Sequence, residues 1–157
     1  MASRELKNTD AGAPQLTGNT VGSLISVLKA ALVTGYGETQ SLGWEVFYED
    51  LVKNVCVFRP KVGTRMFLQV TDDGTFSNGQ NAKVVSYETM TNAYHGTHPC
   101  PVNASYQYIR KTNVASNVAQ NWRIIGDERG FYLLTFPWTS HSNALVRNNS
   151  ILYIPFN

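Results

Sequence analysis

The sequence predicts an α+β fold, in which about seven strands of a predominantly antiparallel sheet or sandwich follow one buried N-terminal helix. Only the stretch from Thr20 to Gly37 has apolar residues that repeat clearly at the helical period. After Gly37 the chain changes to short runs of β-branched and aromatic residues, separated by turn residues. Short strands that follow one another across short turns favour antiparallel pairing, with the helix on one face.

The helix is predicted to span Thr20 to Thr34. Asn19 or Thr20 is expected to cap its first turn, and Gly35 to end it in a left-handed conformation. Lys29 is the only charged residue in the stretch, so the helix is predicted to be buried on most of its circumference, with later strands around it. The apolar stripe that supports this prediction consists of Val21, Ile25, Leu28 and Leu32.

The chain of 157 residues is predicted to have an extended N-terminal arm, residues 1–19, and a single β-rich domain, residues 20–157. Met1–Thr9 is polar and mixed in charge, and Asp10–Asn19 contains two glycines and a proline without periodicity. Such a segment is expected to stay mobile in the isolated chain and to become ordered on a partner.

The predicted strands are bounded by clear turn signals. Asp50–Asn54 and Asp72–Gly74 are predicted turns, and Gly126–Gly130 joins the two strands of the best hairpin. Asn92–Asn103, rich in glycine, proline, histidine and asparagine, is predicted to be a loop. The strands are predicted at Gly43–Tyr48, Val55–Arg59, Arg65–Val70, Ala82–Glu88, Tyr106–Arg110, Trp122–Ile125, Phe131–Phe136 and Ile151–Ile154.

Composition narrows the classes of function. Charged residues make up 15% of the chain, against roughly 25% in a typical domain, and the net charge of +2 is too small to indicate a nucleic-acid partner. No apolar run reaches the length that spans a membrane, and none has the pattern of a signal peptide. The chain is therefore expected to be soluble, made in the cytoplasm, and to keep Cys56 and Cys100 as reduced thiols.

The strongest pattern of metal-binding residue types is His95, His98 and Cys100, since zinc accepts imidazole and thiolate ligands. A structural zinc site needs four ligands, and His141 and Cys56 do not form a second ligand pair. A polar loop is therefore the preferred interpretation, and no metal or cofactor is predicted.

Other patterns of catalytic or metal-binding residues are weaker. Asp72-Asp73-Gly74 lacks the alternating carboxylates and terminal glutamate of a calcium loop. Glu45 and Glu49 are predicted to share one face of a strand, which an exposed strand face explains as well as an acid pair. The chain contains no nucleophile elbow, phosphate loop or dinucleotide fingerprint, so no enzymatic activity is predicted.

Five stretches together resemble one known family. They are DAGAPQLTGNTVGSLISVLKAALVTGYG from Asp10 to Gly37, Gly43-Trp44, Val57-Phe58-Arg59, Tyr87-Glu88-Thr89-Met90, and the Trp122–Leu134 hairpin with Asp127-Glu128-Arg129. The chain thereby resembles a family of small virion structural proteins from tailed bacteriophages, from Asp10 to about Leu134. The resemblance implies membership of a virus particle and brings no catalytic residues. Family members most often read Leu-Asp-Ala-Cys in the helix, where this chain has Leu28-Lys29-Ala30-Ala31, a difference that leaves the helix intact.

The first hypothesis for such a particle protein is a capsid decoration or cement subunit that binds the major capsid protein, as a homo-oligomer in the virion, after assembly in the host cytoplasm. A tail, baseplate or head–tail connector subunit is the alternative. A small hydrolase carried on the particle is the second alternative, and it would need a convergent cluster of acidic, histidine or metal-binding residues. The arm and the polar loops are expected to supply the interface, through Asp10, Pro14, Leu16, His95, His98 and His141.

Overall fold

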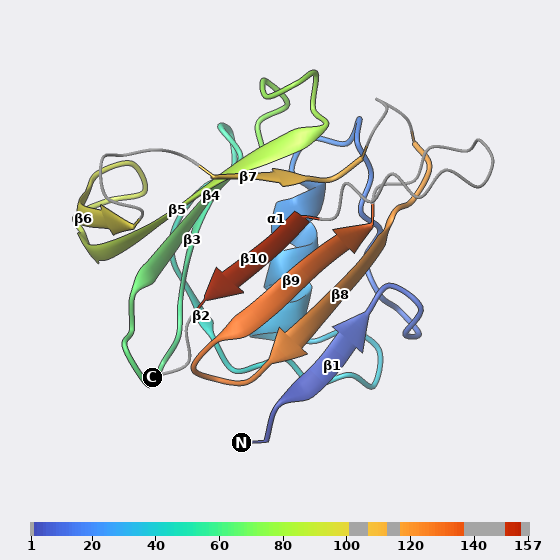
Figure 1. The fold of residues 1–157 in the computed structure, drawn as a ribbon, viewed down its shortest axis with the longest axis horizontal. Helices are drawn as coiled ribbons and strands as arrows, with labels where there is room; N and C mark the ends of the chain where they lie inside the picture. Colours follow the sequence, from blue (N-terminus) through green and yellow to red (C-terminus); the bar gives the residue numbers. More distant parts are fainter. Residues whose placement is uncertain (1, 101–106, 113–116, 137–149, 155–157) are drawn as a thin grey trace.

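The computed structural model describes residues 2–100, 107–112, 117–136 and 150–154, the last of these by backbone alone. Within these ranges, ten strands form two antiparallel sheets that enclose one helical segment (Figure 1). The predicted class, α+β with predominantly antiparallel strands, is therefore confirmed. No helix in the described ranges is long and apolar enough to cross a membrane.

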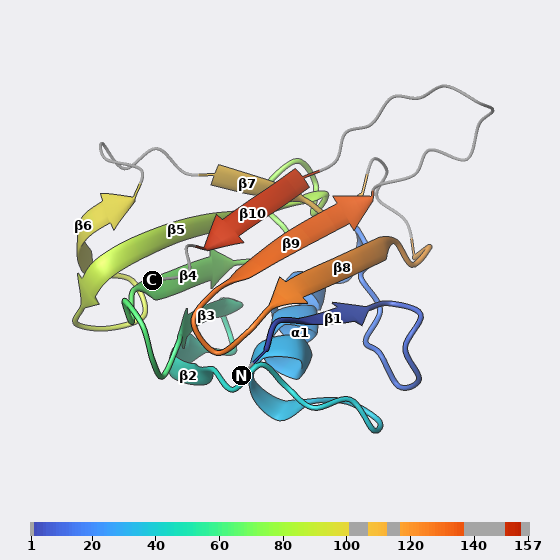
Figure 2. The same cartoon turned by 60° about the horizontal axis from the view of Figure 1, so that its bottom comes forward.

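The first sheet has four strands in the order β1-β8-β9-β10 (Figure 2). The β8–β9 pair is the hairpin that the sequence predicts, with Ile124 opposite Leu133. Asp127 closes its turn, because its N–H donates to the Gly130 carbonyl and its carboxylate accepts from the Arg129 N–H. The strands are β1 (Arg4–Lys7), β8 (Asn121–Gly126), β9 (Phe131–Phe136) and β10 (Ser150–Ile154).

The second sheet has six strands, five of them in the order β2-β3-β4-β5-β6. Strand β5 is long, and one of its edges pairs with β7 through Asn81–Val84 and with β6 through Ser86–Met90. The Thr135 hydroxyl of β9 donates to the Arg110 carbonyl of β7, which ties the two sheets together at one end. The strands are β2 (Glu45–Asp50), β3 (Val55–Arg59), β4 (Phe67–Thr71), β5 (Asn81–Met90), β6 (Gly96–Cys100) and β7 (Gln107–Arg110).

The helical segment consists of α1 (Ser23–Leu28), which continues as the π-helix η1 (Lys29–Thr34). It lies between the sheets, and Ile25, Leu28 and Leu32 of the predicted apolar stripe are buried. The segment ends at Gly35, the predicted position, where φ is 77° and an added Cβ would lie 2.6 Å from the Thr39 carbonyl oxygen. With ψ near 177°, however, Gly35 is not in the left-handed helical conformation. The core around the segment includes Leu6, Leu24, Leu28, Leu32, Phe58, Leu68, Trp122 and Phe131.

The start of the helix differs from the prediction. Gly22 occupies the N-cap position with φ 79°, so neither Asn19 nor Thr20 caps the first turn, and Val21 precedes the helix and is 49% exposed. The cap comes instead from Asp72, 48 residues away, whose carboxylate accepts the Leu24 N–H at 2.9 Å. A distant carboxylate therefore performs the role that a neighbouring side chain has in most helices.

Asp72 is also half of a buried ion pair with Lys111, which follows β7. Their side chains are both 0% exposed, and Lys111 Nζ lies 2.6 Å from the Asp72 carboxylate. The ammonium is also 3.4 Å from the Thr20 carbonyl oxygen and from Ser23 Oγ. Burial raises the pKa of Asp72, and the charge of Lys111 opposes that rise. The ion pair joins the end of β4, the end of β7 and the beginning of α1.

Replacing Lys111 should therefore destabilise the fold. We expect Lys111→Met to lower the free energy of unfolding by about 3–5 kcal/mol, because the Asp72 carboxylate is left buried without its counter-charge. Chemical denaturation of the two proteins gives the difference. The control is Lys61→Met, an exposed lysine in the β3–β4 turn, which should change stability by less than about 0.5 kcal/mol. Equal stability of the two variants would contradict the role given to the ion pair.

The N-terminal segment is not the unstructured arm that the sequence predicts. Arg4–Lys7 forms β1, which pairs with β8 from Arg4 opposite Gly126 to Lys7 opposite Arg123. Leu6 is 1% exposed and belongs to the main core. The expectation that residues 1–9 lack regular structure is therefore wrong, because the edge of β8 provides hydrogen-bond partners and the core accepts the Leu6 side chain.

This docking predicts that Leu6→Ala destabilises the domain by about 2–5 kcal/mol, as for other large-to-small changes in a core. Glu5 is the matched control on the same strand, since its exposed carboxylate pairs with Arg123 at 2.8 Å. Glu5→Ala should cost at most about 1 kcal/mol. Thermal melts of both variants test the difference. An unchanged melting temperature for Leu6→Ala would instead support the prediction that the N-terminal segment is mobile.

Candidate functional site

The turn between β2 and β3, Leu51–Asn54, exposes two consecutive aliphatic side chains. Leu51 is 74% exposed and Val52 is 91% exposed, the two highest values among the large apolar residues that the structure describes. The sequence predicts a turn here, but polar residues are the usual occupants of a turn tip. An exposed aliphatic pair at the end of a hairpin is a candidate contact for another molecule.

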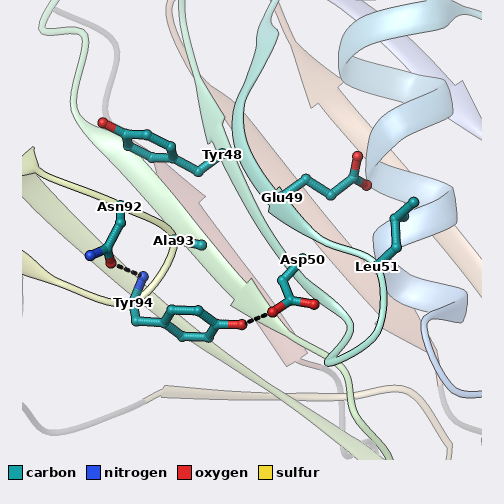
Figure 3. Close-up of a pocket in the computed structure, with 7 residues that line it drawn as sticks. All are labelled: Tyr48, Glu49, Asp50, Leu51, Asn92, Ala93 and Tyr94. Carbon is teal, nitrogen blue, oxygen red and sulfur yellow. Dashed lines mark hydrogen bonds between the residues drawn. The ribbon is translucent and has the colours of Figure 1, made fainter.

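The turn is held in place by Asp50, the last residue of β2. One oxygen of its carboxylate accepts the N–H groups of Val52 and Lys53, each at 3.0 Å. The other oxygen accepts the hydroxyl of Tyr94 from the β5–β6 loop (Figure 3). On the opposite side of the turn, Asn54 has φ 51°, and its carbonyl accepts the Asp72 N–H at 3.0 Å. Leu51 and Val52 therefore project from a braced turn.

The hydrogen bond between Tyr94 and Asp50 shifts the pKa of both groups. It is the largest cause that lowers the pKa of Asp50, followed by the bond from the Lys53 N–H. The same bond raises the pKa of Tyr94 to about 12. The Lys53 ammonium lies 5.1 Å from the centre of the Tyr94 ring. Around neutral pH the turn therefore contains a carboxylate that accepts from a neutral phenol.

Two hollows lie beside the turn. A hollow of about 490 Å³ lies beside it, where Tyr48, Ala93 and Tyr94 supply apolar and aromatic surface and Asn92 supplies an amide (Figure 3). A smaller hollow of about 120 Å³ lies toward α1 and is lined by Val21 and Ile25, among others. Leu51 borders both hollows, so the exposed turn and its adjoining concave surfaces form one continuous patch.

The loop that carries Tyr94 is anchored on the outer face of the larger sheet. Ala93 is buried there, and its carbonyl accepts the Gln69 Nε2 at 2.7 Å. The loop thus covers a second apolar cluster, separate from the main core, which consists of Val55, Val57, Phe67, Met90 and Ala93. Because this loop is packed on the sheet, the Tyr94 hydroxyl is positioned to brace the turn.

Strand β2 carries a β-bulge that changes the predicted arrangement of its acidic residues. Val46 lies opposite Phe58 and Tyr48 lies opposite Val57, so Phe47 is the extra residue. The prediction that Glu45 and Glu49 share a face is therefore wrong, because an extra residue reverses the alternation of side chains. Glu49 instead lies opposite the core residue Cys56 and forms an ion pair with Lys29 of η1.

The predicted interface residues near the N-terminus make contacts within the chain. The Asp10 carboxylate accepts the Lys7 N–H and the Tyr36 hydroxyl, each at 2.9 Å. The Pro14 carbonyl accepts the Trp122 indole N–H at 3.0 Å. Leu16 is 0% exposed, so the prediction that it lies at an interface surface is wrong: it is a core residue. Whether Asp10 and Pro14 also contact a partner stays a prediction.

The predicted histidines lie on or next to β6, inside the segment that the sequence predicts as a loop. The loop prediction is wrong for Gly96–Cys100, where pairing with the edge of β5 outweighs the low strand propensity of glycine and proline. His95 and His98 are exposed, and His98 Nδ1 lies 3.0 Å from the Glu88 carboxylate. Among the described residues, no three histidine, cysteine or acidic side chains lie close enough to hold a metal ion. His141 lies outside the described residues.

The two thiols have different surroundings. Cys56 is buried in the main core, and burial raises the pKa of its thiol to about 12. Cys100 is exposed at the end of β6. Since the thiolate is the reactive form, Cys100 is the more accessible and more reactive of the two.

Comparisons of the chain with family models, with curated proteins and with solved structures find no match. The resemblance to phage virion proteins therefore stays a prediction, and the β2–β3 turn with Leu51 and Val52 is the candidate site. The sequence signal for this site is the Asp50-Leu51-Val52 run inside a predicted turn. Tyr94 gives no such signal, because it lies 44 residues from Asp50 in the chain.

The hydrogen bonds that the Asp50 carboxylate accepts in the turn lead to a prediction about its titration in acid. Asp50 has a lowered pKa, so its contribution to the turn is present above the ordinary value of 3.8 and is lost as the pH falls through the lower, folded value. Tyr94→Phe should move the Asp50 midpoint up toward 3.8. The amide resonances of Val52 and Lys53, followed by NMR against pH, report the midpoint. Tyr48→Phe is the control, because the Tyr48 hydroxyl contacts the Met90 carbonyl instead, and equal midpoints in the two variants would contradict the brace.

Proposed function

We propose that this chain is a structural subunit of a tailed-bacteriophage particle, a capsid decoration protein that binds the lattice of the major capsid protein. It acts by binding and catalyses no reaction. The resemblance to small virion proteins supports the class of particle. The observation that carries the proposal is the exposed Leu51–Val52 pair on a braced turn.

Exposed aliphatic side chains are unfavourable in water, and covering them contributes roughly 25 cal/mol per Å² of buried apolar surface. A side chain on a rigid turn also loses little conformational freedom when it is bound. Because Asp50 fixes the turn from one side and Asn54 from the other, Leu51 and Val52 are suited to act as binding anchors. Exposed apolar side chains on a turn of fixed conformation are suited to a subunit that assembles with other proteins.

A tail, baseplate or head–tail connector subunit would use the same turn at another place on the particle. The two locations differ in symmetry and hence in copy number. A capsid decoration is present on the order of hundreds of copies, whereas a tail component is present in roughly a small multiple of three or six.

Quantitative mass spectrometry of gradient-purified particles, relative to the major capsid protein, tests the proposal. We expect a copy number of roughly hundreds. The double variant Leu51→Ser/Val52→Ser should be at least about tenfold depleted from the particles, the loss that corresponds to about 1.4 kcal/mol of binding. The control is Val62→Ser, an exposed valine in the β3–β4 turn at the other end of the strands, which should be retained. Absence of the wild-type chain from the particles would overturn the proposal.

A further inference from the structure

We propose that Lys111 and Asp72 become joined by a covalent amide bond, which forms within the folded chain without an enzyme. The bond links Lys111 Nζ to the carboxyl carbon of Asp72, with the loss of one water molecule. The buried ion pair is then the precursor of a cross-link as well as a structural contact. This site lies in the interior, so it is independent of the β2–β3 turn and of the proposed function.

The fold holds the two reacting groups against each other. Lys111 Nζ lies 2.6 Å from Asp72 Oδ1, and both side chains are 0% exposed. Both backbones are also fixed, because the Lys111 N–H donates to the Gln80 carbonyl at 2.8 Å and the Asp72 N–H donates to the Asn54 carbonyl at 3.0 Å. Well-oriented groups within one molecule react as if each were present at about 10⁵–10⁸ M. Proximity of this kind can replace an enzyme.

Amide formation requires a neutral amine and a neutral carboxylic acid, and burial favours both of these forms. Removing a charged group from water shifts its equilibrium toward the uncharged state. Burial raises the pKa of Asp72, and the ammonium of Lys111 and the Leu24 N–H oppose this rise without cancelling it. A proton that passes from Nζ to Oδ1 along their hydrogen bond converts the ion pair into the reactive pair.

The groups around the pair match the needs of the reaction. The lone pair of Lys111 Nζ attacks the carboxyl carbon of Asp72, and negative charge develops on Oδ2. The Leu24 N–H already donates to Oδ2 at 2.9 Å, and a fixed donor at that position stabilises the developing charge. The carbon–nitrogen bond forms as the bond from carbon to Oδ1 breaks, and Oδ1 leaves as water with two protons from the ammonium. The hydrogen that stays on the nitrogen has acceptors in the Thr20 carbonyl and Ser23 Oγ, each 3.4 Å from Nζ.

Another lysine–carboxylate pair of the same chain lacks this environment. Lys29 and Glu49 form an ion pair whose side chains are 30% and 27% exposed. Water therefore reaches both charges and stabilises their ionised forms, so no amide bond is expected there. This pair is an internal control for any reaction that depends on proximity alone.

The bond would close a loop between two residues that are 39 positions apart in the chain. Such a closure restricts the unfolded chain in the way that a disulfide does, but it does not depend on redox conditions. The destabilisation expected for Lys111→Met is then a minimum, because that variant lacks the bond as well as the ion pair.

Mass spectrometry of the denatured full chain tests the proposal. We expect the mass to fall below that of the sequence by one water molecule. Trypsin should then release a single branched peptide in which Met66–Lys83 is joined to Lys111–Arg123. Cleavage after Lys111 should be lost, whereas cleavage after Lys29 should be complete.

Lys111→Arg is the matched variant. Its guanidinium keeps a positive charge opposite Asp72, but it stays protonated and is therefore no nucleophile. This variant should have the full mass of its sequence and give no branched peptide. The map of the wild-type chain tests the bond even if the variant folds poorly.

Two results would overturn the cross-link. One is a wild-type chain that keeps its full mass, and is cleaved after Lys111, after a week at room temperature. The other is a water loss that maps to the linear Met66–Lys83 peptide, because the Asp73-Gly74 sequence can lose water as a succinimide. A branched peptide in a chain that is absent from phage particles would establish the bond and count against the proposed function alone.

Discussion

The buried ion pair between Asp72 and Lys111 connects three segments that lie far apart in the sequence. Asp72 directly follows β4, accepts the Leu24 N–H at the start of α1, and pairs with the ammonium of Lys111, which follows β7. Two charges removed from water are costly to separate, although a buried pair by itself adds little net stability. The ion pair instead makes the fold specific. Because both partners are buried, only an arrangement that brings all three segments together leaves neither charge unpaired.

Asp72 also connects the buried ion pair to the candidate site. The Asp72 N–H donates to the Asn54 carbonyl, so the residue that caps the helix also holds one side of the β2–β3 turn. Asp50 and Tyr94 hold the other side. The exposed Leu51 and Val52 are thus supported by contacts that lead back into the core. A surface built in this way presents a fixed shape to a partner. His98, by contrast, is an exposed residue of the edge strand β6, and His95 directly precedes that strand.

The fold also shows how a helix with little charge becomes fully enclosed. The larger sheet covers one side of the α1–η1 segment and the smaller sheet covers the other, so the two sheets share one core. Strand β1 completes the smaller sheet and brings Leu6 into that core. The N-terminal residues that might serve as an arm in another protein are here part of the enclosure, which leaves the β2–β3 turn as the more prominent apolar feature of the described surface.

Features that depend on residues close together in the chain can be predicted from the sequence. The helical period placed the buried segment up to Thr34 and its end at Gly35, and turn residues marked Asp50–Asn54 and the β8–β9 hairpin. Features that depend on residues far apart in the chain become visible only in the folded molecule. Strand β1 forms because it pairs with the edge of β8, and β6 forms because it pairs with the edge of β5. The N-terminus of α1 is capped by a carboxylate 48 residues away. The bulge at Phe47 turned Glu49 toward Lys29, and the brace on the turn required Tyr94. Local periodicity reports which face of a segment is apolar, but it contains no information about which distant group will satisfy a given hydrogen bond or charge.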